Sequence, residues 1–201
     1  MKRILIVFAK EPEKGKVKTR LSGCLSPRQC LKLYKGLLKE TVVLARSAGC
    51  GQKIIAYDSG GQNPEFLKKI AGDFKFHRQK GRGLGERMFN AFKSALADQA
   101  KAVIIGSDSP GLPVSRIRRA FELLDENDLV LGPANDGGYY LIGLKKPCQK
   151  IFTGIEWSSR SVFKKTLVRA GKLKKKTAVL DFWHDIDTPQ DLKYLKPGRY
   201  R

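Results

Sequence analysis

The chain has 201 residues, of which 40 are Lys or Arg and 19 are Asp or Glu, so its formal net charge is +21. Its length and its 41% of hydrophobic residues favour a folded protein with one core, and we expect a single domain over residues 1–201. No run approaches the roughly 20 apolar residues of a membrane-spanning helix, and no export signal follows the basic start. We therefore expect a cytoplasmic protein without a membrane span.

The excess of positive charge predicts attraction to polyanions such as nucleic acid or phosphorylated metabolites. A groove for single-stranded nucleic acid combines basic with regularly interleaved aromatic residues. The two densest basic runs, residues 10–20 and 164–176, lack that pattern. A non-catalytic nucleic-acid binder is therefore ranked well below an enzyme that binds a small phosphorylated ligand.

Strand-like and helical patterns alternate along the chain, which predicts a three-layer α/β/α fold with a mostly parallel central sheet. Strand-like runs lie at residues 3–9, 53–57, 74–78, 102–106, 128–132, 139–144 and 177–182. Helical patterns begin at Ser26, after Asn63, at Leu84, at 114, at 159 and at Thr188. Ligands of such sheets bind beyond the carboxyl ends of the strands, so the loops there are the first candidates for a site.

A basic loop follows the first predicted strand. It reads AKEPEKGKVKTRL and carries Lys10, Lys18 and Arg20. Arg can grip phosphate oxygens with paired donors and Lys acts as a point charge, so this loop suits a polyphosphate. A solvated basic loop is an equally good interpretation, because lysines occur throughout the chain.

A Gly-rich turn, QKGRGLGERM, precedes the helix that begins near Leu84. The exposed N–H groups at such a helix start attract anions, and Arg87 lies in the first turn. By residues alone, a plain loop with neighbouring charges explains this turn better. The helix itself has an apolar stripe, expected in the core, of Leu84, Met88, Phe92 and Leu96.

Three aspartates lie at positions where they could take part in metal binding or catalysis. Asp108 follows an apolar strand in IIGSDSPGLP and could bind Mg or Mn, although helix capping is the better interpretation from the residues alone. Asp136 lies with Gly137 and Gly138 in GPANDGGYYLIGL, a strong hairpin signal whose glycines could also let a substrate approach the backbone. Asp187 in DIDTPQDL could favour a helix start or serve as a second metal carboxylate.

Six blocks in this order resemble a bacterial family of small nucleotide-diphospho-sugar transferase-like proteins, once labelled a domain of unknown function and also known as arsenosugar-biosynthesis-type glycosyltransferases. The blocks are FAKEPEKGKVKTRL, GLGERM, IIGSDSPGLP, LGPANDGGYYLIGL, FTGIEWSS and DIDTPQDL. More distantly, the chain is similar to 2-phospho-L-lactate and molybdenum-cofactor guanylyltransferases. One departure concerns Gly111, where family members commonly have an acidic residue.

The resemblance implies a GT-A fold and a site for a nucleotide. It implies that Lys10, Lys18 and Arg20 bind the nucleotide phosphates, with Arg87 as a further nucleotide-binding residue. It makes Asp108 the main ligand of Mg or Mn and Asp187 the candidate second ligand. The catalytic candidates are Asp108 and Asp136, and the substrate-binding candidates are Gly137 and Gly138.

Two enzymatic functions remain open. The first is a metal-dependent glycosyltransferase with a nucleotide-sugar donor. The second is a nucleotidyltransferase that uses a nucleoside triphosphate and releases pyrophosphate, favoured because Ser107-Asp108-Ser109 lacks the paired carboxylates that many GT-A glycosyltransferases use. Either enzyme would act on a small-molecule acceptor that the sequence does not identify.

Overall fold

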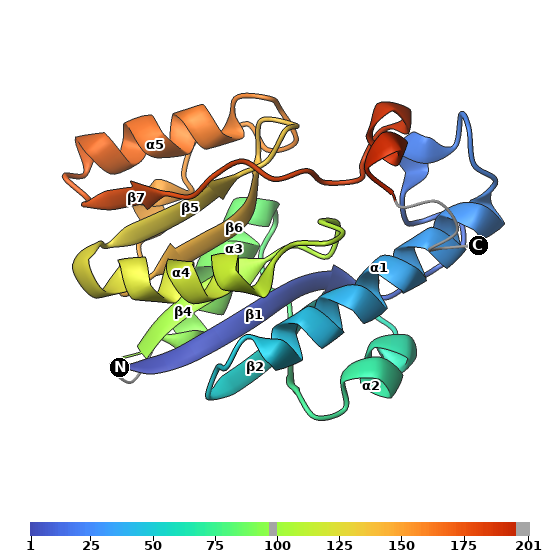
Figure 1. Ribbon diagram of the computed structural model, residues 1–201, viewed down its shortest axis with the longest axis horizontal. Helices are drawn as coiled ribbons and strands as arrows, with labels where there is room; N and C mark the ends of the chain where they lie inside the picture. The colour runs from blue at the N-terminus through green and yellow to red at the C-terminus, as the bar shows by residue number, and fades with distance from the viewer. Residues whose placement is uncertain (97–99, 196–201) are drawn as a thin grey trace.

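The computed structural model describes residues 1–96 and 100–195 and shows a three-layer α/β/α arrangement around one seven-stranded sheet (Figure 1). The strand order is β3-β2-β1-β4-β6-β5-β7. Strand β6 runs antiparallel to its neighbours β4 and β5, and the other neighbouring pairs are parallel. The predicted fold class is confirmed.

The predicted elements are all present, with ends that differ by a few residues. The strands are β1 (Lys2–Lys10), β2 (Gln52–Asp58), β3 (Lys75–Arg78), β4 (Ala100–Ile105), β5 (Leu129–Pro133), β6 (Tyr139–Leu144) and β7 (Thr177–Val179). The α-helices are α1 (Pro27–Ser47), α2 (Glu65–Ala71), α3 (Leu84–Ala95), α4 (Val114–Glu126) and α5 (Val162–Lys172). The 3-10 helices are η1 (Thr19–Leu21), η2 (Gln149–Ile151) and η3 (Pro189–Tyr194). Within the described part of the chain, no helix is long and apolar enough to cross a membrane.

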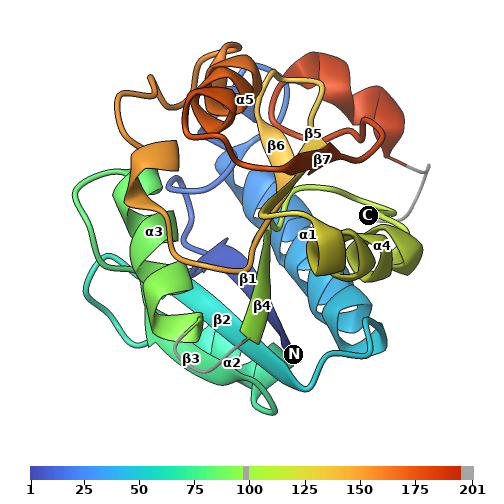
Figure 2. The same cartoon turned by 90° about the vertical axis from the view of Figure 1, so that its left-hand side faces the viewer.

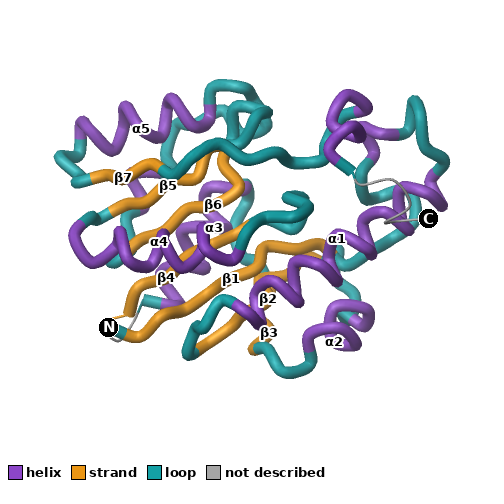
Figure 3. Tube along the Cα trace, viewed as in Figure 1, coloured by secondary structure: helices purple, strands orange, loops and turns teal. Residues whose placement is uncertain are grey.

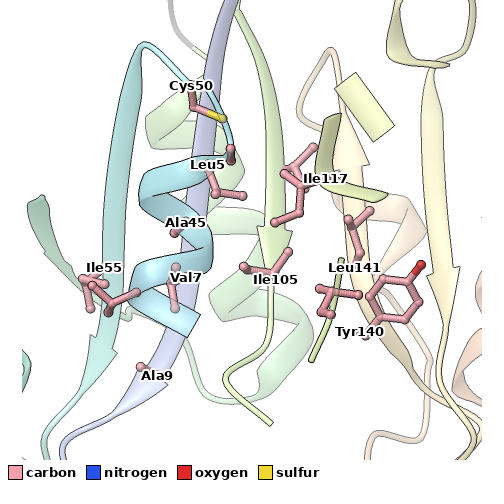
Figure 4. Close-up of a cluster of buried hydrophobic side chains, with 14 of the residues drawn as sticks. Leu5, Val7, Ala9, Ala45, Cys50, Ile55, Ile105, Ile117, Tyr140 and Leu141 are labelled. Carbon is pink, nitrogen blue, oxygen red and sulfur yellow. The ribbon is translucent and has the colours of Figure 1, made fainter. Parts of the chain in front are cut away.

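Two hydrophobic clusters fill the space between the layers. Helices α1, α2 and α4 cover one face of the sheet, and α3 and α5 cover the other (Figure 2). Strand β1 contributes alternate residues to the two faces, as a central strand must. In Figure 4, Leu5 and Val7 of β1 meet Ala45 of α1 on the first face.

The chain after β7 leaves the sheet and crosses to the opening loop. It first follows β5, where Leu180 N donates to Leu131 O at 2.8 Å and Trp183 N donates to Pro133 O at 3.1 Å. It then reaches η3, which lies beside the loop after β1 (Figure 3). Ile186 of this crossing segment is fully buried in a small third cluster with Leu21 of η1. The segment after β7 is thereby joined to the loop that follows β1.

Helix α3 packs closely against the segment that follows β6. A Cβ on Gly85 would lie 2.5 Å from the indole ring of Trp157, so only glycine allows this contact. Trp157 also meets Tyr139 edge-on, with 6.4 Å between ring centroids. The Gly-rich turn therefore has a packing role as well as any role in binding.

The Gly85–Trp157 contact predicts opposite effects for two helical glycines. Gly85→Ala should lower the free energy of unfolding by about 2 kcal/mol, because the new methyl group must displace a packed ring. Gly171→Ala in α5 should raise it by up to ~1 kcal/mol, because a Cβ there meets no atom within 4 Å and alanine favours a helix. Urea denaturation of both variants checks this, and equal effects would contradict the account of Gly85.

Candidate functional site

A cleft of about 500 Å³ opens at the carboxyl ends of β1 and β4. This is the edge of the sheet at which ligands of open α/β proteins bind. Its wall includes six of the residues singled out in the sequence: Lys10, Lys18, Arg20, Arg87, Asp108 and Asp187. Residues from the opening loop, the middle of the chain and the C-terminal crossing segment thus meet in one place.

The phenol of Tyr34 joins the carboxyl ends of β1 and β4. Its hydroxyl accepts a hydrogen bond from Lys10 N at 2.9 Å and lies 3.2 Å from Lys10 O, to which it donates. Ser107 Oγ donates to the same hydroxyl at 3.4 Å. Burial raises the pKa of Tyr34, so the phenol stays protonated. Tyr34 also lines the cleft and was not identified from the sequence, where it is one apolar position of α1 among others.

Lys18 is almost fully buried, with 3% of its side chain exposed. Its ammonium lies 2.6 Å from Asp108 Oδ1 and donates a hydrogen bond to the carbonyl of Ile186. The backbone adds a second link, since Ile186 N donates to Asp108 O at 2.9 Å. Lys18 therefore holds the opening loop, the loop after β4 and the C-terminal segment together, in addition to its predicted role in phosphate binding.

Arg20 and Asp187 form a second ion pair on the cleft wall, with 2.6 Å between Nη1 and Oδ2. Asp187 is placed by the capping box of η3, because its N–H donates to Asp191 Oδ2 at 3.1 Å. The same Asp191 oxygen accepts from Thr188 N at 2.7 Å. This capping box, formed by Thr188 and Asp191, fixes the direction in which Asp187 leaves the backbone.

Asp108 and Asp187 both line the cleft, and their role as ligands of a divalent cation stays a prediction. Asp108 Oδ1 is buried against the Lys18 ammonium, and 40% of the Asp108 side chain remains exposed. Among residues 1–96 and 100–195, no three His, Cys, Asp or Glu side chains are grouped around one metal position. Mg commonly binds through one or two carboxylates and completes its shell with phosphate oxygens and water, and the two aspartates match that pattern.

Arg87 points from the first turn of α3 to the end of β2. Its Nη1 donates to Asp58 Oδ2 at 2.7 Å and its Nε donates to Gly81 O at 3.2 Å. Burial opposes ionisation of Asp58, but the Arg87 guanidinium and the N–H of Gly60 leave its pKa below the usual value. Both groups are charged at neutral pH, and Arg87 is held against the cleft.

From the sequence, one further residue of the cleft wall was expected in the core and another was not singled out. Leu84, expected in the core, is 44% exposed and lines the cleft, because it is the first residue of α3 and lies beyond the edge of the sheet. Gln79 also lines the cleft, and its Nε2 donates to Ala56 O at 2.8 Å. A single glutamine after a short strand carries no signal that would have singled it out.

The segment Asp136–Gly138 forms the predicted hairpin between β5 and β6 and does not line the cleft. Gly138 N donates to Asp136 Oδ1 at 2.8 Å, which closes the turn. Gly137 has φ +87°, and a Cβ there would lie 2.1 Å from Arg160 O. The turn and the contact with Arg160 account for these glycines, and their part in substrate binding stays a prediction.

Gly111 occupies a left-handed position with φ +66°, which glycine adopts without steric cost. Its N–H donates to Glu40 Oε1 at 2.7 Å, so a carboxylate from α1 lies beside this loop. The loop after β4 is therefore held from both sides, by Glu40 and by Lys18.

Asp185 is a largely buried carboxyl close enough to Asp108 to be affected by its charge. Burial and the charges of Asp108 and Asp136 raise its pKa to about 7, against the opposing effects of the hydrogen bond from Ser109 Oγ and the charge of Lys18. The sequence placed Asp185 in an acidic cluster without distinguishing it, because the burial of one aspartate among several is a property of the fold.

Comparisons with known proteins agree with this geometry. The family described as "Uncharacterized protein conserved in bacteria (DUF2064)" matches residues 41–159, more than half of the chain. The chain belongs to the DUF2064 family. A crystal structure from Desulfovibrio desulfuricans, of a protein proposed to be a nucleotide-diphospho-sugar transferase, is similar with a TM-score of 0.90 and 33% identity. The match covers 98% of this chain and 87% of that one.

Two other similar proteins are more distant. The 2-phospho-L-lactate guanylyltransferase of Methanocaldococcus jannaschii is 28% identical over 88% of this chain and 75% of its own length. A Mycobacterium tuberculosis protein, solved in complex with manganese, shares the fold with a TM-score of 0.59 and 17% identity, over 97% of this chain and 98% of that one. The comparisons confirm the predicted family and the transferase class, and they support a transferase that uses a nucleotide.

The buried carboxyl of Asp185 predicts a pH dependence of stability in metal-free buffer. Between the usual pKa of an aspartate, about 3.9, and its folded value of about 7, the folded state binds more protons than the unfolded state. The free energy of unfolding should therefore fall as the pH rises through this window. Asp185→Asn should flatten the fall and be the more stable form at pH 8, by roughly 1–3 kcal/mol. Urea denaturation from pH 4.5 to 8 with a chelator measures it, and parallel curves for the two proteins would refute the assignment.

Proposed function

We propose that this DUF2064 protein is a nucleotidyltransferase that binds a nucleoside triphosphate in the cleft and releases pyrophosphate. The observation that carries the proposal is the set of cationic side chains on the wall of the same cleft as Asp108, the carboxylate that follows β4. They are Lys10, Lys16, Lys18 and Arg20, with Arg87 on the wall beside Gln79. A triphosphate needs this much positive charge, and the similarity to a guanylyltransferase supports the same class of reaction.

In this reaction an oxygen of the acceptor forms a bond to the α-phosphorus, and the bond between that phosphorus and the oxygen leading to the β-phosphorus breaks. Negative charge grows on the departing pyrophosphate, where Lys10 and Arg20 would stabilise it. An acceptor with a carboxylate or phosphate oxygen is already ionised at neutral pH and requires no general base. For a hydroxyl acceptor the sequence predicts Asp136 as the base, but the Asp136 hairpin does not line the cleft, so that role is not part of the proposal.

A divalent cation, Mg or Mn, is part of the proposal. Asp108 and Asp187 would hold it, and it would supply positive charge to the triphosphate when bound. The manganese complex of a protein with the same fold supports a metal of this kind. Lys18 keeps Asp108 Oδ1 in place from the buried side, which leaves Oδ2 as the oxygen available at the cleft.

Glycosyl transfer from a nucleotide-diphospho-sugar is the second candidate. It is favoured by the similarity to the Desulfovibrio desulfuricans protein, which has the higher identity of the two named enzymes. The two reactions differ in the product that leaves. Nucleotidyl transfer releases pyrophosphate, and glycosyl transfer releases a nucleoside diphosphate.

The product released when water takes the place of the acceptor distinguishes nucleotidyl transfer from glycosyl transfer. With labelled nucleoside triphosphates and Mg or Mn, we expect nucleoside monophosphate and pyrophosphate. Asp108→Asn should reduce that rate by about 10²-fold or more, the usual effect of losing one charged group at the reacting phosphate. Asp73→Asn, which alters an exposed ion pair with Arg46, is the matched control and should leave the rate unchanged. Nucleoside diphosphate formed from nucleotide-sugars alone would favour glycosyl transfer instead.

A further inference from the structure

Gln79 and Arg87 form one wall of the cleft, and the same two residues line a second cavity of about 350 Å³ beside it. The second cavity lies between α3 and the edge strand β3, with His77 and Asn90 on its sides. A planar ring bound at this wall would therefore have the space of the cleft on one side and that of the second cavity on the other. Leu84, exposed on the cleft side, offers it an apolar surface.

The carboxamide of Gln79 has a fixed orientation. Its Nε2 donates to Ala56 O at 2.8 Å and, at a longer 3.4 Å, to Ala9 O, the carbonyls at the ends of β2 and β1. A flipped amide would place Oε1 against these two carbonyl oxygens, which repel it. The backbone of Gln79 is also held, since its N–H donates to Tyr57 O at 2.8 Å. Gln79 therefore presents Oε1, an acceptor, to a ligand.

Oε1 of Gln79 has no donor among residues 1–96 and 100–195. A carbonyl oxygen accepts two hydrogen bonds, so two donors of a ligand can be satisfied there. Arg87 supplies the opposite function beside it. Its Nε and Nη1 are engaged by Gly81 O and Asp58, which leaves Nη2 as a donor.

We propose, on the basis of the proposed nucleotide function, that Gln79 is the specificity-determining residue of the cleft and that the base it selects is guanine. Among the four common bases, only guanine has two neighbouring donors, N1–H and the N2 amino group, next to a carbonyl acceptor, O6. The donors match Oε1 of Gln79 and O6 matches Arg87. Adenine and cytosine offer one amino group beside a ring nitrogen, and uracil one N–H between two carbonyls.

The proposal makes the N2 amino group of guanine and Gln79 an energetically coupled pair. Calorimetry in Mg-containing buffer should show the wild-type protein binding GTP about tenfold more tightly than ITP, which lacks only this amino group; that factor corresponds to ~1.4 kcal/mol. 7-deaza-GTP, which keeps the whole edge that faces Gln79, should bind like GTP. In Gln79→Met, of similar size and without the amide oxygen, the GTP and ITP affinities should become equal.

Two controls separate this proposal from a damaged fold and from a wrong function. Inorganic tripolyphosphate should bind Gln79→Met as it binds the wild type, because the phosphate part of the cleft is unchanged. Asp73→Asn, at the exposed ion pair with Arg46 outside both cavities, should keep the tenfold preference for GTP. Equal binding of GTP and ITP by the wild type, or a preference that survives in Gln79→Met, would overturn the role of Gln79 while nucleotide binding stands. Binding of no nucleoside triphosphate at all would overturn the proposed function itself, and the base selection with it.

Discussion

The buried ammonium of Lys18 is the interaction on which the cleft depends. A charge removed from water must be matched by opposite charge and hydrogen bonds, or it destabilises the fold by several kcal/mol. Asp108 supplies the charge and the carbonyl of Ile186 supplies the hydrogen bond. Lys18 reaches both from a left-handed backbone position with φ 51°, a conformation that costs a non-glycine residue about 1 kcal/mol or more. Its contacts with Asp108 and Ile186 hold Lys18 in this strained conformation and fix three distant segments at one point.

Ion pairs between a cation and a carboxylate recur around the cleft. Arg20 is paired with Asp187 and Arg87 with Asp58, so these cations are held by carboxylates on neighbouring segments. Long flexible side chains lose much of their rotational freedom in such pairs, and a ligand that binds them afterwards has less ordering to provide. The large net charge of the chain brings polyanions near, and the pairs give a few of its cations a defined geometry.

The fold could be predicted from the sequence because the alternation of strands and helices is a local pattern, as in the buried run that became β4 and the capped start of α1 at Ser26. The loops that carry Lys18, Asp108 and Asp187 could be named because ligands of this architecture gather at the carboxyl ends of the strands.

What could not be predicted depends on contacts between distant residues. The role of Tyr34 arises from the approach of α1 to two strand ends, and that of Gln79 from an amide held by two carbonyls. The exposure of Leu84 follows from where the sheet ends, which periodicity does not reveal. The hairpin at Asp136 was predicted correctly, yet its signal says nothing about whether the turn faces the cleft.

A double-mutant cycle on Lys18→Met and Asp108→Asn, measured as free energies of unfolding in urea, tests the central claim most directly. If the buried pair joins the three segments, each single variant leaves a group without its partner, and the two changes together should cost about 2 kcal/mol less than the sum of the single changes. Additive effects, with a coupling near zero, would show that the cleft is held together without this ion pair.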